Sequence, residues 1–192
     1  MISISVDRSF IDELLPQHAI VVWLTGLSGA GKSTIANALK KHLIEYGIFN
    51  LVLDGNVIRS GLNKDLGFSL PDRLENIRRV AEICKILIEN KIVVFCAFIS
   101  PTIEIRELAK KIIGKEYFFE IYIKTSFEIC EERDTQGLYA KSRLGKINDF
   151  TGVSSPFEIP ENPDLIIDTY NVSVEENVRK IYETISPILR IS

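Results

Sequence analysis

AIVVWLTGLSGAGKST, residues 19–34, is the stretch that decides the fold of this chain. Residues 19–25 are an uninterrupted apolar and β-branched run that ends at a glycine, which is typical of a parallel strand buried on both faces. Over residues 32–46, Ile35, Leu39 and Leu43 recur at four-residue intervals, which predicts a helix. The stretch therefore predicts a strand, a glycine-rich loop and a helix in direct succession.

The glycine-rich loop carries a phosphate-binding pattern. Residues 26–33, GLSGAGKS, match G-x-x-x-x-G-K-[ST] between a predicted strand and a predicted helix. Glycines let backbone N–H groups turn inward on phosphate oxygens, and the helix N-terminus adds a positive dipole. We expect Lys32 to reach the β- and γ-phosphates of ATP and Ser33 to bind Mg²⁺. The predicted nucleotide-binding residues of this loop are Gly26, Leu27, Ser28, Gly29, Ala30, Gly31, Lys32 and Ser33.

Elsewhere, short apolar runs alternate with longer stretches of helical period, which is typical of βαβ winding. We therefore predict a single α/β domain with three layers, α/β/α, around a five-stranded parallel sheet. The predicted strands are residues 19–25, 49–53, 92–98, 117–123 and 165–167. The predicted helices are residues 32–46, 70–89, 102–113, 126–133 and 173–187.

Residues 134–163 break this alternation. The segment has no sustained apolar period, and it intersperses Lys141, Arg143 and Lys146 with the aromatic residues Tyr139 and Phe150. Long unpatterned segments in compact domains are often functional loops, and a disordered excursion is the alternative. We interpret the segment as a mobile basic lid.

Composition narrows the classes of protein. The 192 residues, of which 46% are hydrophobic, suffice for one domain with a substantial core. The net charge of -3 argues against a protein that binds the nucleic-acid backbone. No apolar run approaches the roughly 20 residues that span a bilayer, and the N-terminus is too polar for a signal peptide. We expect a cytoplasmic protein that is not a domain of a larger fused enzyme and that has no membrane or nucleic-acid partner.

A phosphate loop alone does not distinguish a kinase from a GTPase or an ATPase. The chain lacks a guanine-reading N-K-x-D at a suitable place, and it is too short for a large ATPase machine. One phosphate loop with a basic lid favours a small nucleotide or metabolite kinase. A non-catalytic nucleotide-binding domain is the rival interpretation, and Lys32 and Ser33 argue against it because such a domain would not need them.

Beyond the loop, residues 22–169 resemble the adenylylsulfate kinase family block by block. The resemblance implies an enzyme that uses ATP to phosphorylate the ribose 3′-hydroxyl of adenosine 5′-phosphosulfate (APS), and it suggests a homodimer. It also places Thr34 among the ATP-binding residues. The matching blocks are WLTGLSGAGKST (23–34), LDGNVIR (53–59), GLNKDLGFS (61–69), DRLENIRR (72–79), FISP (98–101), ERD (132–134), GLY (137–139) and FTG (150–152).

The resemblance implies a pocket for the acceptor nucleotide. Phe68 would stack on the purine, as aromatic side chains do on nucleobases. Arg59 and Arg73 would bind the phosphosulfate, because a guanidinium fork contacts two oxygens at once. Asn76 lies three residues after Arg73, on the same helical face, and could hydrogen-bond the same ligand.

The resemblance also assigns residues at a strand end and in the lid. Ile99 and Ser100 follow a central strand, where α/β sheets place ligands, and backbone groups there could read the purine or position the ribose. Family descriptions often make this serine a phosphorylated intermediate, but transfer between two bound nucleotides needs no covalent relay, so we favour positioning. Lys141 would neutralise charge on the substrate, Phe150 would stack on the purine's other face, and Arg133 would cover the adenine or phosphates of ATP.

One departure from the family pattern lies at residue 56. The family usually reads Asp-Gly-Asp where this chain has Asp54-Gly55-Asn56, and an asparagine can orient a hydroxyl but cannot accept its proton. Asp54 therefore becomes the candidate base and outer-sphere Mg²⁺ ligand, with Asn56 as a substrate contact.

Three explanations for Asn56 stay open. Asp54 suffices in an ordinary family member, the chain is a weakened or engineered variant, or the acceptor is a related 5′-nucleotide such as cytidine diphosphoramidate. APS stays ahead as the acceptor, because the anion-binding Arg59, Arg73 and Lys141 are all retained.

Overall fold

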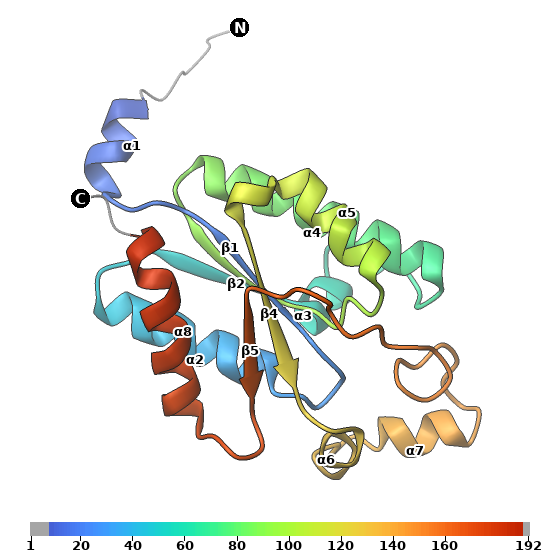
Figure 1. Cartoon of the computed structure of the whole chain (residues 1–192). Helices are drawn as coiled ribbons and strands as arrows, with labels where there is room; N and C mark the ends of the chain where they lie inside the picture. Colours follow the sequence, from blue (N-terminus) through green and yellow to red (C-terminus); the bar gives the residue numbers. More distant parts are fainter. Residues whose placement is uncertain (1–7, 190–192) are drawn as a thin grey trace, which may run out of the picture.

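The computed structural model describes residues 8–189. Five parallel strands form one sheet in the order β2-β3-β1-β4-β5, with helices on both faces (Figure 1). The predicted three-layer fold with a five-stranded parallel sheet is therefore confirmed. The strands are β1 (Val21–Thr25), β2 (Asn50–Asp54), β3 (Val93–Ala97), β4 (Phe118–Lys124) and β5 (Leu165–Asp168).

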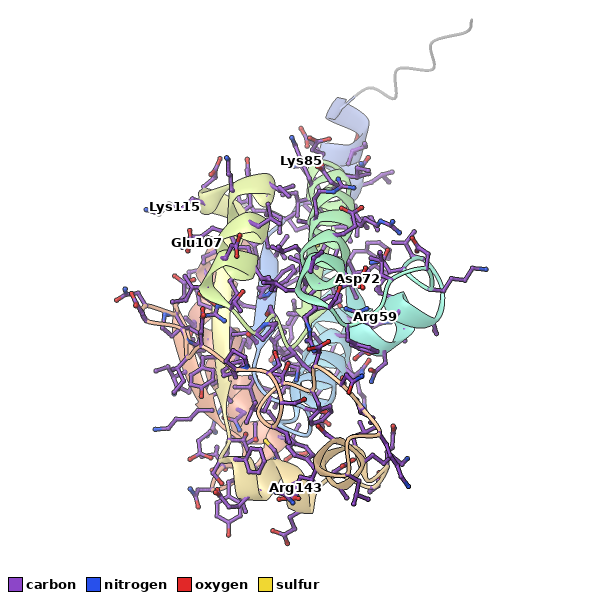
Figure 2. The ribbon with its side chains drawn as sticks, turned by 90° about the vertical axis from the view of Figure 1, so that its right-hand side faces the viewer. Arg59, Asp72, Lys85, Glu107, Lys115 and Arg143 are labelled. Carbon is purple, nitrogen blue, oxygen red and sulfur yellow. The ribbon has the colours of Figure 1, made fainter. Side chains whose placement is uncertain are left out.

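Two pairs of long helices cover the sheet. α2 (Lys32–Glu45) and α8 (Val174–Leu189) lie together on one face, while α4 (Leu70–Glu89) and α5 (Ile103–Ile113) lie on the other (Figure 1). Figure 2, turned by 90°, shows α4 and α5 side by side. The shorter elements are α1 (Arg8–Leu14), α3 (Gly55–Ser60), α6 (Phe127–Glu132), α7 (Leu138–Arg143) and a 3₁₀ turn (Lys115–Tyr117).

The central strand β1 is buried along its whole length because it supplies both halves of the core. Val22 and Leu24 join the cluster under α2 and α8, whereas Val21 and Trp23 join the cluster under α4 and α5. Full burial of a large apolar side chain contributes roughly 1.5–3 kcal/mol, so a strand with two packed faces needs a continuous apolar run. This explains why residues 19–25 show no alternation.

The predicted helix 70–89 is observed as α4 with the same bounds, and the predicted helix 126–133 is observed as α6, whereas α1, α3, α7 and the 3₁₀ turn were not predicted. α1 and α3 have seven and six residues, too few to show a helical period. α3 begins directly after β2 because the Asp54 side chain caps it, accepting a hydrogen bond from the backbone N–H of Asn56. Residues 134–163 contain one short helix, α7, which the lack of an apolar period gave no reason to expect.

The parallel winding gathers polar loops at one edge of the sheet. The phosphate loop (residues 26–33) follows β1, α3 follows β2, and the turn around Ser100 follows β3. Because carboxyl ends of parallel strands meet at the same edge, these loops surround one crevice. Within residues 8–189, none of the helices has the length and apolar character needed to cross a bilayer.

Candidate active site

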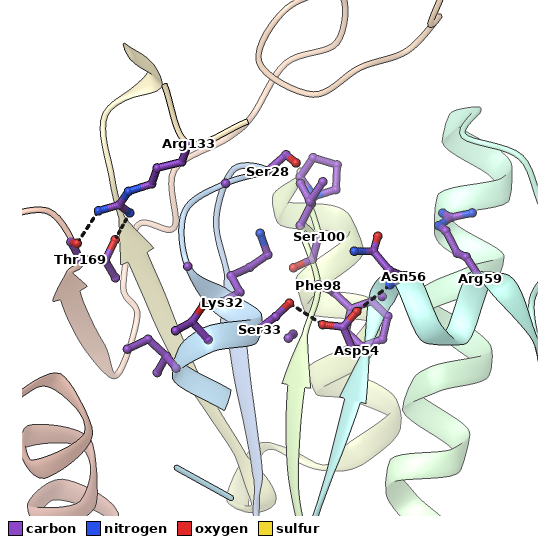
Figure 3. Close-up of a pocket in the computed structure, with 18 of the residues that line it drawn as sticks. Ser28, Lys32, Ser33, Asp54, Asn56, Arg59, Phe98, Ser100, Arg133 and Thr169 are labelled. Atoms are coloured by element: carbon purple, nitrogen blue, oxygen red, sulfur yellow. Dashed lines mark hydrogen bonds between the residues drawn. The ribbon is translucent and has the colours of Figure 1, made fainter. Parts of the chain in front are cut away.

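A cavity of about 510 Å³ occupies this crevice (Figure 3). Residues from the phosphate loop line one part of it, and residues from α3, α4 and the segment between them line another. The predicted site residues that line it are Ser28, Gly29, Gly31, Lys32, Ser33, Thr34, Asp54, Asn56, Arg59, Phe68, Arg73, Asn76, Ile99, Ser100 and Arg133. The structure thus brings most of the predicted site together.

The phosphate loop is packed so tightly that it needs its glycines. Gly29 has φ +79, and a Cβ there would lie 2.5 Å from the backbone oxygen of Cys130. Lys32 is buried, and its ammonium donates to the backbone oxygens of Gly26 at 2.9 Å and Leu27 at 2.6 Å. Burial lowers the pKa of Lys32 from 10.5 to about 8. An anion bound in the loop would stabilise the charged ammonium.

Asp54 and Ser33 meet between β2 and α2. The Ser33 hydroxyl donates to Oδ2 of Asp54, and Oδ1 of Asp54 accepts from the backbone N–H of Asn56 at 2.9 Å (Figure 3). Within the described part of the chain, no group of three or more His, Cys, Asp or Glu side chains could hold a metal. Mg²⁺ in kinase sites is usually bound by one or two protein oxygens together with phosphates and waters, and the Ser33–Asp54 pair fits that requirement.

Asn56 stands in the first turn of α3 and lines the cavity beside Asp54. Figure 3 shows its side chain near Asp54, on the same side of the cavity. Its amide can donate and accept hydrogen bonds but cannot take up a proton. Asp54 is therefore the only carboxylate of the Asp54-Gly55-Asn56 segment.

Arg59, Phe68 and Arg73 form one cluster although they come from three separate segments. The guanidinium carbon of Arg59 lies 4.5 Å from the centre of the Phe68 ring, and that of Arg73 lies 5.8 Å from it. Burial lowers the pKa of both arginines, and nearby Asp72 opposes this for Arg59 (Figure 2). Phe68 is 54% exposed although Arg59 lies over its ring, so part of the ring remains accessible to a ligand.

Asn76 is buried on α4, and Asn63 holds it in place. Nδ2 of Asn63 donates to Oδ1 of Asn76 at 3.0 Å, and Asn63 is itself fully buried. Because this bond occupies the Asn76 oxygen, the Asn76 amide nitrogen is the group available to a ligand in the cavity. Asn63 was not among the predicted site residues, because its contact with Asn76 arises only from the tertiary fold.

Ser100 is held by a buried hydrogen-bond network. Its hydroxyl accepts from Nε1 of Trp23 at 3.0 Å and donates to Oγ1 of Thr25 at 3.0 Å, and its φ is 37. Its backbone oxygen accepts from Arg106 at 2.9 Å, and Arg106 pairs with Glu120 at 3.0 Å. The hydroxyl is therefore already engaged on both sides, which suits a positioning residue better than a nucleophile.

A family model described as adenylylsulphate kinase matches residues 18–168. The chain belongs to this family.

Relatives match nearly the whole chain. An adenylyl-sulfate kinase of Bacteroides thetaiotaomicron is 52% identical over 182 residues, 95% of this chain and 90% of that protein. One from Prochlorococcus marinus is 50% identical, covering 93% of this chain and 91% of that protein. Among solved structures, the APS kinase of Mycobacterium tuberculosis, in complex with AMPPNP and APS, is similar with a TM-score of 0.85 and 42% identity. That match covers 89% of this chain and 99% of that chain.

In this adenylylsulphate kinase family member, Arg133 lies on the opposite side of the cavity from Arg59 (Figure 3). It donates to the hydroxyl of Thr169 at 3.1 Å and to the Thr169 backbone oxygen at 2.7 Å (Figure 3). Thr169 in turn donates to the backbone oxygen of Ala30 at 2.8 Å, so this corner rests on the phosphate loop. Val172 and Val174 also line the cavity. They were not among the predicted site residues, although both follow β5 and parallel sheets bind ligands beyond the carboxyl ends of their strands.

Two predicted site residues of the lid, Lys141 and Phe150, lie outside the cavity lining. Lys141 donates to the backbone oxygen of Gln136 at 2.9 Å, and Phe150 packs edge-on against Tyr139 with ring centres 4.9 Å apart. Neither lines the cavity in this arrangement of the lid. Their roles toward a bound substrate stay predictions. Gly26, Leu27 and Ala30 also lie outside the lining, although they form the backbone of the phosphate loop.

The lid (residues 134–163) is anchored to the body of this kinase-family chain. Arg143 forms an ion pair with Glu131 on α6. At the other end of the lid, the backbone N–H of Glu158 donates to Pro101 at 2.8 Å, and its carboxylate accepts from the N–H of Ile103 at 2.6 Å. The lid is therefore tied both to α6 and to the turn beside Ser100.

Proposed function

We propose that this chain is an adenylyl-sulfate kinase that transfers the γ-phosphoryl group of ATP to the ribose 3′-hydroxyl of APS, with Mg²⁺ as cofactor. The products are 3′-phosphoadenosine 5′-phosphosulfate and ADP. One observation carries the proposal: a single cavity joins the phosphate loop at Lys32 to the Arg59–Phe68–Arg73 cluster, with Asp54 between them. Such a cavity can hold two nucleotides with their reacting groups together.

The donor half is suited to ATP. The backbone of the phosphate loop and the Lys32 ammonium would hold the β- and γ-phosphates, and Arg133 would cover the adenine or the phosphates. Ser33 and Asp54 would hold Mg²⁺, and the ion would neutralise charge that develops during the transfer. The M. tuberculosis relative, solved with AMPPNP, supports ATP as the donor.

The acceptor half is suited to an anionic 5′-nucleotide. The exposed face of Phe68 offers a stacking surface, which is worth roughly 1–3 kcal/mol per base. Arg59 and Arg73 add two guanidinium groups, 4.5 and 5.8 Å from the ring centre, where a 5′-phosphosulfate could lie. Asn76 would donate its amide to the same ligand, held in that orientation by Asn63.

Asp54 is the residue that we assign to the reacting hydroxyl. Phosphoryl transfer to a hydroxyl is mostly positioning and charge neutralisation, and one carboxylate suffices to orient the hydroxyl and accept its proton. Asn56 beside it would orient the ribose. Ser100 forms no covalent intermediate in this scheme, because its hydroxyl is held by Trp23 and Thr25.

The test is a panel of acceptors with the purified protein. ADP release from Mg²⁺-ATP is measured alone, with APS, and with cytidine diphosphoramidate, and a Lys32→Ala variant serves as the inactive control. We expect strong stimulation by APS and a product phosphorylated at the 3′ position. A higher kcat/KM for cytidine diphosphoramidate would reassign the acceptor. No stimulation by either nucleotide would favour a non-catalytic domain.

A further inference from the structure

Three consecutive residues of the phosphate loop touch α6 or the lid. The backbone oxygen of Ser28 accepts a hydrogen bond from the Tyr139 hydroxyl at 2.7 Å. On one side of Ser28, Leu27 packs so close to Gly152 that a Cβ on that glycine would lie 3.1 Å from Cδ2 of Leu27. On the other side, Gly29 lies against the backbone of Cys130. The phosphate loop is thus supported from outside the cavity.

Tyr139 is the polar side chain among these contacts, and it is deeply buried. It comes from α7 in the lid, is 1% exposed, and lies between two phenylalanine rings. The centre of its ring is 5.1 Å from that of Phe127 on α6 and 4.9 Å from that of Phe150 in the lid, both in edge-on geometry. Burial raises the pKa of Tyr139, so its hydroxyl stays a hydrogen-bond donor.

The bond to Ser28 constrains the peptide group that follows it. A trans peptide is planar, and its C=O and N–H point in opposite directions. When Tyr139 holds the Ser28 oxygen on the lid side, the N–H of Gly29 must therefore point away from Tyr139. Ser28 and Gly29 both line the cavity, so this N–H is directed to the side where phosphate would bind.

We infer that Tyr139 is a positioning residue that orients the phosphate loop for ATP and links ATP affinity to the packing of the lid. The inference rests on the proposed function insofar as the ligand is ATP. Tyr139 acts through Ser28 and does not touch the nucleotide. Phe127 acts through Tyr139 by bracing its ring. A change in the packing around Phe150 would then reach the phosphate loop through the same hydroxyl.

The main test replaces Tyr139 with phenylalanine, which removes the hydroxyl and keeps the ring. We expect the affinity for AMPPNP, measured by calorimetry without any acceptor, to fall about two- to tenfold, the usual equivalent of one hydrogen bond. The affinity for APS measured alone should stay unchanged. Tyr117→Phe is the matched control, because Tyr117 lies in the 3₁₀ turn and lines no part of the cavity. It should change neither affinity.

A second variant tests whether Phe127 supports the position of the Tyr139 ring. Phe127→Leu keeps the Tyr139 hydroxyl but removes one of its two aromatic neighbours, and we expect a smaller loss of AMPPNP affinity. In the double variant with Tyr139→Phe, the two losses should not add, because Phe127 acts through the hydroxyl. If Tyr139→Phe does not fold, as judged by circular dichroism, Phe127→Leu alone decides, and unchanged AMPPNP affinity in it overturns the inference.

The remaining outcomes separate this inference from the proposed function. A lower melting temperature of Tyr139→Phe with unchanged AMPPNP affinity would mean a merely structural residue, and the inference would be wrong. Weaker AMPPNP binding in that variant, together with no turnover of APS by the unmodified protein, would support Tyr139 as a positioning residue. It would at the same time reject APS as the acceptor.

Discussion

The Ser33 hydroxyl donates directly to the Asp54 carboxylate, so the start of α2 and the end of β2 meet at the centre of the cavity. The same carboxylate caps α3 through the N–H of Asn56. The Asp54 side chain therefore caps α3 and is also the proposed base, and a substitution can separate these two roles.

Asp54→Asn should keep the cap and remove the base. The amide oxygen can still accept from the N–H of Asn56, so the melting temperature should change little. Loss of the proton acceptor should lower kcat about 10²- to 10⁴-fold in an ADP-release assay with APS. Asp12→Asn on α1, which lines no part of the cavity, is the control and should keep full activity. Turnover near that of the unmodified enzyme would refute Asp54 as the base.

Asn56→Asp should restore the second carboxylate of the family pattern. The side chain lines the cavity beside Asp54, so an aspartate there would face the same acceptor hydroxyl. We expect kcat to rise by up to about tenfold, and the double variant with Asp54→Asn to regain part of the lost turnover. Steady-state rates of the four proteins measure both effects. If Asn56→Asp changes neither rate, position 56 only orients the substrate.

Lys32 should make ATP affinity depend on pH. Its pKa in the folded protein is lowered to about 8 by burial, so above that pH the free enzyme loses the ammonium that we expect to bind phosphate. AMPPNP affinity should fall above pH 8, approaching about tenfold per pH unit. Between pH 8 and 10.5 the unfolded chain binds the extra proton, so this group makes the free protein more stable as pH rises through that window. A flat affinity profile from pH 7 to 9.5 would contradict this prediction.

Long regular elements of the fold could be predicted from the sequence, whereas side-chain networks could not. α4 shows five helical turns of apolar period, and β1 is a continuous apolar run, so both were found. Tyr139 and Asn63 contact Ser28 and Asn76 across 111 and 13 residues of chain, and no local pattern reports such contacts. Resemblance supplied the roles of residues such as Lys141, which in this lid arrangement lies outside the cavity.

Ser100→Ala should separate positioning from covalent catalysis. The substitution removes the Ser100 hydroxyl that accepts from the buried Nε1 of Trp23, which should cost about 1–3 kcal/mol of stability. Arg106 can still hold the backbone oxygen of residue 100, so the turn should persist and kcat should stay within about tenfold. Thermal melting and ADP release measure the two effects. A folded variant that has lost all turnover would instead indicate a phosphorylated serine intermediate.

Phe68→Ala should weaken the binding of the acceptor nucleotide and leave the binding of ATP unchanged. The ring is 54% exposed and lies under the guanidinium of Arg59, so its removal opens no buried cavity and the melting temperature should hold. Loss of a stacking surface worth roughly 1–3 kcal/mol should raise KM for APS about 5- to 150-fold. KM for ATP should not change, because the phosphate loop lies in another part of the cavity.

Two further variants make this prediction specific to stacking. Phe68→Trp keeps an aromatic face and should retain most of the APS affinity that Phe68→Ala loses. Phe49→Ala removes a ring of similar exposure, 49%, just before β2 and outside the cavity lining, and it should leave KM for APS unchanged. If Phe68→Ala and Phe49→Ala behave alike, Phe68 is not a nucleobase platform. The two arginines would then have to bind APS without a stacking contact from Phe68.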